Sequence, residues 1–387
     1  MQPNLSPKTL DSGRIEAFLC DISFSEEEEA FRRALLARAG TFPLSLQYGL
    51  GMKAEYPEVE ELLKEGINVQ HDVRLRGGAT LHPLAKDEAR RDGVLALLER
   101  EATNVYDAVV SALWKENVVV EFSGEGALHL SSTYFANHNE LIVIHVHAGA
   151  KGTVVEEIKG KENKVSARTI VAIVEKGGTL EYRSSLAPET GGTLFLRQFG
   201  IVHESASLAW FDVSRGGGRV YTRTVSELAG AHATSNIYMT AVSQAERHLD
   251  VEHRMSHHAS DTHSRIATAG VGGGTSRTIY RGDIAVAKGT VRTEGRQEGR
   301  FLVLEPSAKI DAVPALDVAS HDVKSSHALS VGYLSPTMLF YPRLRGVHAE
   351  DAVGFLVSGM MKKTLSRGGA SEKDAYEMSR IGEALDK

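Results

Sequence analysis

The pattern of apolar and polar positions changes twice along the chain. Between residues 26 and 38, Phe31, Leu35 and Leu36 recur at the spacing of one helix face, behind Ser25 and Glu28 in the arrangement of a capping box. Two more segments with helical periodicity follow, in residues 85–102 and 104–116. The pattern therefore predicts an N-terminal helical region over residues 1–117.

From residue 118 the pattern becomes short β-branched runs separated by small residues, as in VVVEF and LIVIHVH. A small-residue corner, a hydroxyl residue and an extended run recur together six times. The hydroxyl residues are Thr153, Thr179, Ser207, Thr234, Thr262 and Thr290. Subtracting these numbers gives separations of 26, 28, 27, 28 and 28 residues. Such a near-constant period indicates repeated structural units rather than irregular loops.

A unit of this length cannot bury its own apolar face and must stack on its neighbours. Because the units read as strands without helices, we expect a mainly β fold, a right-handed parallel β-solenoid with one coil per period over residues 118–333. Small residues suit the corners, where a large side chain would collide with the adjacent coil. An ordinary β-sandwich with glycine-rich turns is the alternative interpretation.

Beyond residue 333 helical signals return and predict a C-terminal helical region over residues 334–387. Ser335 followed by Pro336 is an N-cap with proline at the first helical position. The next helix is expected to carry one apolar stripe, with Phe355 and Met361 off it; the stripe comprises Ala349, Ala352, Val353, Leu356 and Met360. A last helix is predicted over residues 371–385. This region would cover an open solenoid end or offer an apolar face to another protein.

Charge and cysteine usage restrict the possible partners. Lys plus Arg number 44 against 50 Asp plus Glu, a formal net charge of −6, which argues against nucleic-acid or anionic-membrane partners. The single cysteine, Cys20, excludes an internal disulfide and a four-thiolate cluster site within one chain. The N-terminal residues lack the pattern of a signal peptide, and no window holds 18 apolar residues. We expect a soluble, cytoplasmic protein.

Common catalytic motifs are missing from the sequence. There is no GxxxxGK[ST] phosphate loop and no GxSxG elbow, and GVGGGT at Gly270 is best interpreted as a tight turn. Of the sixteen histidines, His145 and His147 are two residues apart and share one strand face. His253, His257 and His263 all have odd residue numbers, the parity expected of one strand face, whereas His258 does not. No adjacent glutamate or cysteine completes a ligand set, which favours ordinary strand histidines. A metal-dependent enzyme on a β-solenoid or cupin-like core, and a carbohydrate-active solenoid, remain alternatives.

One stretch, residues 253–365, contains five distinctive segments in this order: YRGDI at 280–284, PALDV at 314–318, DVKSSHA at 322–328, LFYPRLRG at 339–346 and EDAVGFLVSGM at 350–360. In these segments and their order, the stretch resembles the core of the SufB/SufD family of iron–sulfur cluster assembly proteins. The resemblance implies a solenoid core and a C-terminal helical unit that docks the ABC-type ATPase SufC. It also implies pairing of two SufB/SufD-like subunits through the C-terminal solenoid edge.

The resemblance also suggests site residues. His327 matches the family's interface histidine, and neutral imidazole can ligate iron; Asp322, Lys324 and Ser325 complete the expected cluster-assembly interface. His327 is accordingly the only metal-ligand candidate among them. The expected ATPase contacts are Tyr341, Arg345, Gly346, Ala352, Phe355 and Met360. The resemblance implies no intrinsic cofactor, only a transient iron–sulfur cluster at a subunit interface.

Several positions depart from the family pattern. Ser325 replaces the motif cysteine, and a serine hydroxyl is a much weaker iron or sulfur ligand than a thiolate, so sulfur cannot be carried here as a persulfide. Ala328, Leu329 and Ser330 replace a Gly-Ala-Thr run, and Pro342 is expected to interrupt the docking helix. The chain thus resembles SufD more than SufB, a non-enzymatic subunit whose second chain is a SufB-like protein or another copy of itself.

Overall fold

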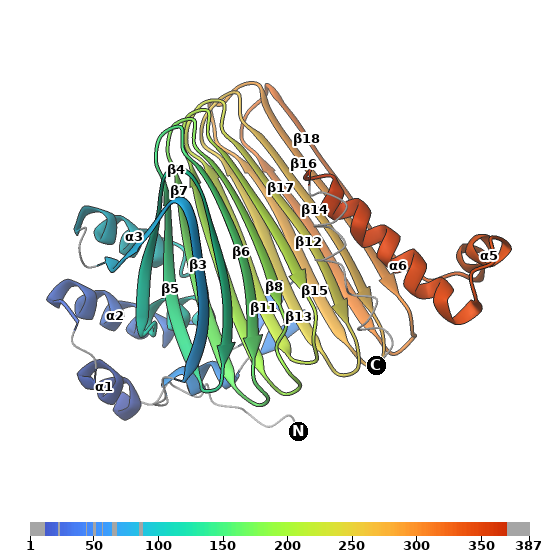
Figure 1. Cartoon of the computed structure of the whole chain (residues 1–387), viewed down its shortest axis with the longest axis horizontal. Coiled ribbons are helices and arrows are strands. Elements are labelled where there is room, and N and C mark those ends of the chain that lie inside the picture. Colours follow the sequence, from blue (N-terminus) through green and yellow to red (C-terminus); the bar gives the residue numbers. More distant parts are fainter. Residues whose placement is uncertain are drawn as a thin grey trace.

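The computed structural model describes residues 12–21, 24–43, 45–48, 52–55, 57–63, 68–84 and 88–369. Figure 1 shows a long stack of strands with helices near both ends of the chain. The N-terminal elements are α1 (Ser12–Asp21), α2 (Glu26–Ala39), β1 (Ser45–Tyr48), β2 (Met52–Glu55), η1 (Pro57–Leu63), β3 (Val69–His82), α3 (Glu88–Arg100) and α4 (Val105–Ala112). The C-terminal helices are α5 (Pro336–Leu344) and α6 (Ala349–Ser366).

The stack is a parallel β-solenoid, as the repeat predicted. Its strands are β4 (Glu116–Tyr134), β5 (His138–Val146), β6 (Lys151–Gly160), β7 (Val165–Val174), β8 (Thr179–Leu186), β9 (Thr193–Val202), β10 (Ser207–Ser214), β11 (Arg219–Leu228), β12 (Thr234–Ser243), β13 (His248–His257), β14 (His263–Gly272), β15 (Arg277–Val286), β16 (Thr293–Val303), β17 (Lys309–Val318) and β18 (Val323–Tyr333). Odd-numbered strands β5 to β17 form one face and even-numbered strands β6 to β18 the other.

Strand β4 begins both faces. Its first part, Glu116–Phe122, pairs with β5, and its second part, Glu125–Tyr134, pairs with β6. Strand β3 runs antiparallel along β4 and lies over the first coil (Figure 1). The sequence patterns gave no indication of β3, since only its side toward β4 is shielded and its residues are mostly exposed.

The turns explain the repeat. Thr179, Ser207 and Thr234 pair with one another in register at the first positions of β8, β10 and β12. The other three repeated hydroxyl residues, Thr153, Thr262 and Thr290, do not occupy this paired position. Two positions before the paired residues, the backbone adopts a positive φ in each turn, at Gly177, Ser205 and His232. Gly149, Asp261 and Arg292 continue the series in the neighbouring coils. At Gly177 a Cβ would meet nothing, so glycine there serves backbone conformation rather than close packing.

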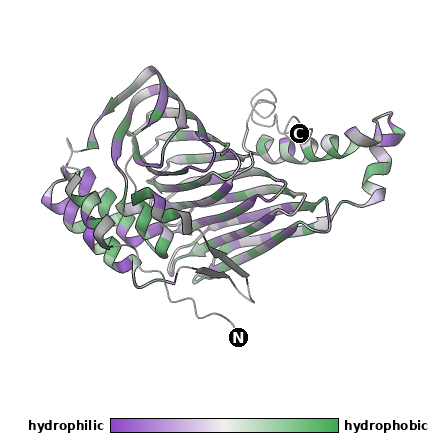
Figure 2. Ribbon diagram, turned by 90° about the horizontal axis from the view of Figure 1, so that it is seen from below, coloured by the Kyte–Doolittle hydropathy of each residue, from purple (hydrophilic) through white to green (hydrophobic). Residues whose placement is uncertain are grey.

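The strands contribute side chains to two apolar layers, one on each side of the sheet. Residues facing the lumen, such as Ile144, Trp210 and Ile266, form the inner core between the two faces. Residues facing outward from the odd-numbered strands, such as Val143 and Phe195, pack under the N-terminal helices. Figure 2 shows the resulting alternation of hydrophobic and hydrophilic residues along the strands.

Helix α2 confirms the first helical prediction: Ser25 is its N-cap and its hydroxyl accepts a hydrogen bond of 3.2 Å from the Glu28 amide. The helix predicted over residues 371–385 lies outside the described residues. None of the helices in the described ranges is both long and apolar enough to span a bilayer.

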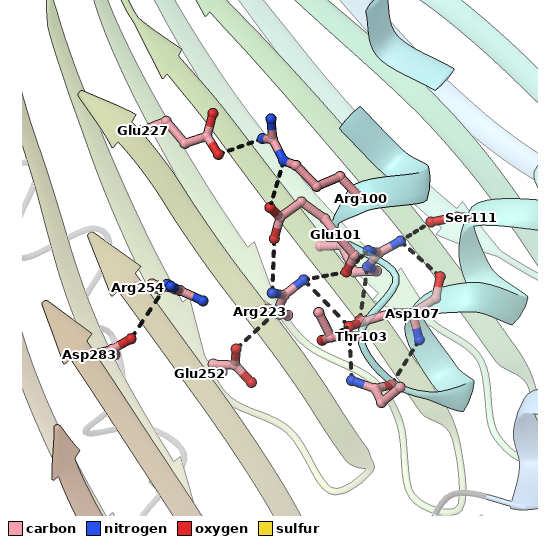
Figure 3. A network of polar contacts seen from close by, with 12 residues as sticks. Arg100, Glu101, Thr103, Asp107, Ser111, Arg223, Glu227, Glu252, Arg254 and Asp283 are labelled. Atoms are coloured by element: carbon pink, nitrogen blue, oxygen red, sulfur yellow. Dashed lines mark hydrogen bonds and ion pairs between the residues drawn. The ribbon is translucent and has the colours of Figure 1, made fainter. Parts of the chain in front are cut away.

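Buried ion pairs attach the N-terminal helices to the odd-numbered face (Figure 3). Asp107 of α4 is fully buried, with its carboxylate 3.1 Å from Arg197 Nε and 3.4 Å from an Arg223 nitrogen. Arg223 also pairs with Glu101 and Glu252, at 3.0 and 2.9 Å. The Asn104 side chain caps α4 by accepting from the Asp107 amide at 2.9 Å, which holds the helix end over the strands. One carboxylate therefore joins β9, β11 and the helical layer.

Replacing Asp107 with alanine is expected to lower the free energy of unfolding by about 3–5 kcal/mol, because buried Arg197 loses its carboxylate partner. Urea denaturation followed by circular dichroism measures the change. Asp92→Ala is the matched control, since Asp92 is exposed beside Arg91 and such a substitution changes stability by less than about 0.5 kcal/mol. Equal effects at the two positions would contradict the anchoring role of Asp107.

Candidate functional site

The residues predicted for cluster assembly lie on β18, the last strand of the even-numbered face. Parallel pairing places His327 beside Gln297 and Ser325 beside Gly295, both at lumen-facing positions of β16. Lys324 belongs to the opposite side of the strand, where its ammonium lies 3.1 Å from the Glu294 carboxylate. The structure therefore brings Ser325 and His327 onto one face.

Asp322, the fourth predicted residue, precedes β18 and is exposed. It lies one residue before the strand that carries the other three. Exposure also distinguishes the two lumen-facing residues: His327 is exposed, whereas the Ser325 hydroxyl oxygen is buried.

The final coil, β17 with β18, presents its lumen side to solvent. Leu316 pairs with the buried Ile284, and Val331 with the buried Phe301, yet Leu316 is 39% and Val331 is 44% exposed. Side chains at the same positions of earlier coils are covered by the following coil. Within the described residues no strand follows β17 or β18 in either face (Figure 1), so an apolar edge with His327 in it remains open.

Helices α5 and α6 form an arm that projects past the open edge (Figures 1 and 2). Large apolar side chains on this arm face solvent, each 60% exposed or more: Phe340, Tyr341, Leu344 and Phe355. Tyr341 and Phe355 were among the predicted ATPase contacts, whereas Phe340 and Leu344 were not. Their spacing of four residues within one short helix was the available signal.

The other end of α6 is anchored to the solenoid. Its buried residues Val357, Met361 and Leu365 pack with Phe211 and Tyr238 on the outer side of the even-numbered face. The predicted stripe was wrong in placing Met361 off the apolar face, because the two aromatic rings of β10 and β12 fix which side of the helix is covered. Ala352 is fully buried and Met360 is partly buried against this cluster, so neither is freely accessible to a partner.

Pro342 does not interrupt its helix, contrary to the prediction. Helix α5 continues from Pro336 to Leu344 with Pro342 inside it, because the missing amide falls in the last turn of a short helix. Gly346 then ends the helical segment with φ +86°. Arg345 lies 3.0 Å from the Tyr341 hydroxyl and over its ring, at 5.3 Å from the centroid. These two predicted contact residues are exposed and adjacent.

Of the three odd-numbered histidines, His253 and His257 lie inside the solenoid lumen. His257 has hydroxyl partners on both ring nitrogens, Thr262 and Ser264, each at 2.8 Å. His253 contacts Thr268 at 3.3 Å and lies edge-on to Tyr280. Burial lowers the pKa of His253 to about 3 and that of His257 to about 4, so both rings are neutral. They are hydrogen-bonded core histidines, and His263 is exposed apart from them.

The other histidine pair has acidic neighbours that sequence spacing concealed. Glu121 of β4 lies 3.6 Å from His145 and 3.9 Å from His147, and Glu175 lies 2.7 Å from His145. The expectation that no adjacent glutamate joins these histidines in a ligand set was based on sequence neighbours, whereas pairing of β4, β5 and β7 joins residues 24 to 54 positions apart.

Comparison with known proteins agrees with the fold. The family model for the SufBD core domain, described as SUF system FeS cluster assembly, matches residues 117–360. This chain belongs to the SufBD family. The match covers the solenoid, the open last coil and most of α6, and it confirms the family resemblance found in the sequence.

Individual SufBD relatives are distant. An iron–sulfur cluster assembly SufBD family protein of Mycobacterium leprae is 28% identical over 161 residues, which is 42% of this chain and 18% of the relative. Iron–sulfur cluster assembly protein SufD of Escherichia coli is 27% identical over 142 residues, 37% and 34% of the two chains. A SufBD family protein of Pyropia yezoensis is 22% identical over 248 residues, 60% and 51%. The chain thus spans about half or less of each of these relatives.

The lumen histidines predict acid sensitivity. In the unfolded chain His253 takes up a proton near pH 6.5, whereas burial lowers its pKa in the fold to about 3. Its contribution to stability is therefore present above pH 6.5 and is lost as the pH falls toward 3. His253→Gln is expected to reduce the loss of unfolding free energy between pH 7 and 4.5 by about 2–3 kcal/mol, measured by urea denaturation. The exposed His203→Gln serves as control, and equal pH dependence of both variants would contradict the assignment.

Proposed function

We propose that this chain is a SufD-like, non-catalytic subunit of an iron–sulfur cluster assembly complex. In this role it pairs through its open last coil with a SufB-like chain, or with a second copy of itself, and binds a SufC-like ABC ATPase through the α5–α6 arm. The observation that carries the proposal is the uncovered lumen edge of β17 and β18, which belongs to a SufBD core and includes His327.

The open edge supports pairing for a physical reason. A strand at the end of a sheet leaves backbone donors and acceptors unpaired, and natural proteins protect such edges with charge, proline or a covering element. The edge strands contain Pro314 and Lys324, but lumen-facing Leu316 and Val331 are still half-exposed, and Tyr333 is 66% exposed at the strand end. Covering these groups with a second solenoid edge would bury them and extend both faces.

His327 gives this interface its proposed chemistry. A neutral imidazole ligates iron, and exposed His327 lies where a partner strand would meet β18. Ser325, two positions away on the same face, offers only a hydroxyl, which is a poor iron or sulfur ligand. The thiolates for a transient cluster would therefore come from the partner chain, with the cluster as cargo rather than a resident cofactor.

The arm supports binding of an ATPase. Nine-residue α5 and the first turns of α6 expose four large apolar side chains to solvent, a number that favours a surface covered by a partner. An apolar helix face of this kind can bind in a hydrophobic groove of another protein. Since α6 is fixed to β12 and β14 by Met361 and Leu365, movement of a docked ATPase would be transmitted to the solenoid. ATP binding would then favour one arrangement of the paired subunits by a population shift.

The first test is co-purification of the tagged chain from its own host under anaerobic conditions, with mass spectrometry of the bound proteins. We expect an ABC-type ATPase and a cysteine-bearing homologue. The double variant Leu344→Asp with Phe355→Asp is expected to lower ATPase recovery about tenfold or more, a loss of at least about 1.4 kcal/mol, because charge replaces the apolar contact. Leu75→Asp on β3, at a side chain 39% exposed, is the matched control. Retention of the ATPase by the double variant would remove the docking assignment.

Pairing through the open coil has a separate test. Leu316→Lys with Val331→Lys is expected to convert the paired species to single chains in sedimentation velocity, because two ammonium groups enter the apolar edge. The matched control is Val73→Lys, at a side chain 43% exposed on the opposite end of the solenoid. Unchanged pairing in the edge variant would overturn the interface.

A further inference from the structure

A cluster of metal-ligating side chains lies at the other end of the solenoid from His327. It combines Glu121 of β4, His145 of β5 and His147 in the turn after β5. One ligand atom from each residue lies within 4.8 Å of the others, and the two imidazole rings have centroids 4.3 Å apart. Helix α3 covers the cluster on one side through Arg90, while His147, with 40% of its side chain exposed, leaves it open to solvent.

The hydrogen bonds around His145 fix its tautomer. An Arg90 nitrogen lies 2.8 Å from Nδ1, and because a guanidinium only donates, Nδ1 carries a lone pair. Nε2 therefore carries the proton and donates a hydrogen bond to the Glu175 carboxylate at 2.7 Å. Glu175 is itself held, since its second oxygen accepts from the Ala148 amide at 3.2 Å. A carboxylate on the far nitrogen of an imidazole is the usual support for a metal-ligating histidine.

Arg90 places a positive charge between Glu121 and His145. The same guanidinium nitrogen that contacts His145 is 2.7 Å from a Glu121 oxygen, so a positive group already bridges two of the three ligand residues. The other Glu121 oxygen lies 3.4 Å from His82 Nε2. A divalent cation would satisfy the same lone pairs if the guanidinium moved aside.

We propose that Glu121, His145 and His147 bind one divalent first-row transition-metal ion, with Glu175 orienting His145 and Arg90 occupying the site when no metal is bound. Two imidazoles and one carboxylate form a ligand set suited to zinc or ferrous iron rather than to calcium or magnesium. The site is separate from the pairing edge and does not rest on the proposed assembly role. Its residues come from β4 and β5, from the turns that follow β5 and β7, and from α3.

The test is calorimetric titration of the full, untagged chain with Zn²⁺ after treatment with chelator. We expect one ion per chain in the wild type and at least tenfold weaker binding in His147→Ala and Glu121→Gln. His203→Ala, in the equivalent turn after β9, is the matched control and is expected to bind like the wild type. Co²⁺ absorption in the visible range reports imidazole and carboxylate ligation independently of affinity.

Two further variants separate a metal site from a structural ion-pair cluster. Glu175→Gln is expected to weaken Zn²⁺ binding about 10–100-fold through loss of the support for His145. Arg90→Gln is expected to tighten binding about tenfold or more, since the competing guanidinium is gone. Circular dichroism of each variant establishes that the fold is retained. No stoichiometric binding in either the wild type or Arg90→Gln, or binding that is unaffected by His147→Ala, would overturn the proposal.

Discussion

Parallel, in-register stacking of the coils is the constraint on which the rest of the structure depends. Each lumen-facing side chain is covered by the residue at the same position of the next coil, as Trp210 is by Ile237 and Ile266 by Gln297. A stack of this kind must have two ends, and the two ends cannot be alike. At the first coil, β4 contributes to both faces and β3 lies over it; at the last coil, β17 and β18 have no successor in the described part of the chain.

The helical regions differ in how they attach to this stack. The N-terminal helices combine a large apolar contact with buried ion pairs around Asp107, whose charges have to be satisfied together. The C-terminal arm attaches through an apolar contact, in which Val357, Met361 and Leu365 of α6 pack with Phe211 and Tyr238, and Met338 of α5 lies against the same cluster. The buried ion pairs around Asp107 thus lie toward the first coils, whereas the most exposed large apolar side chains, Tyr333, Phe340, Tyr341, Leu344 and Phe355, lie at or beyond the last coil.

The sequence was sufficient for features that repeat or are local. The 28-residue period predicted the solenoid, and Ser25 and Ser335 predicted helix starts that the structure has, because caps and turns depend on residues a few positions apart. Features set by pairing between distant segments were not accessible. Strand β3 depends on β4, the covered side of α6 depends on two aromatic rings, and Glu121 meets His145 only because β4 lies beside β5. On β18, the motif located His327, but only the register with β16 separates its face from that of Lys324.

The regular coil makes the solenoid a molecular ruler. Neighbouring strands of a sheet are about 4.8 Å apart, so each added or deleted coil would move the two ends relative to each other by that distance without altering either end. Because α6 is anchored on β12 and β14, the arm is set back from the last strand by two coils on the even-numbered face. Gain or loss of whole repeats between β4 and β12 would therefore preserve the spacing between arm and open edge. The same change would shift β9 and β11 relative to the N-terminal helices, so the contacts of Asp107 with Arg197 and Arg223 depend on the present number of coils.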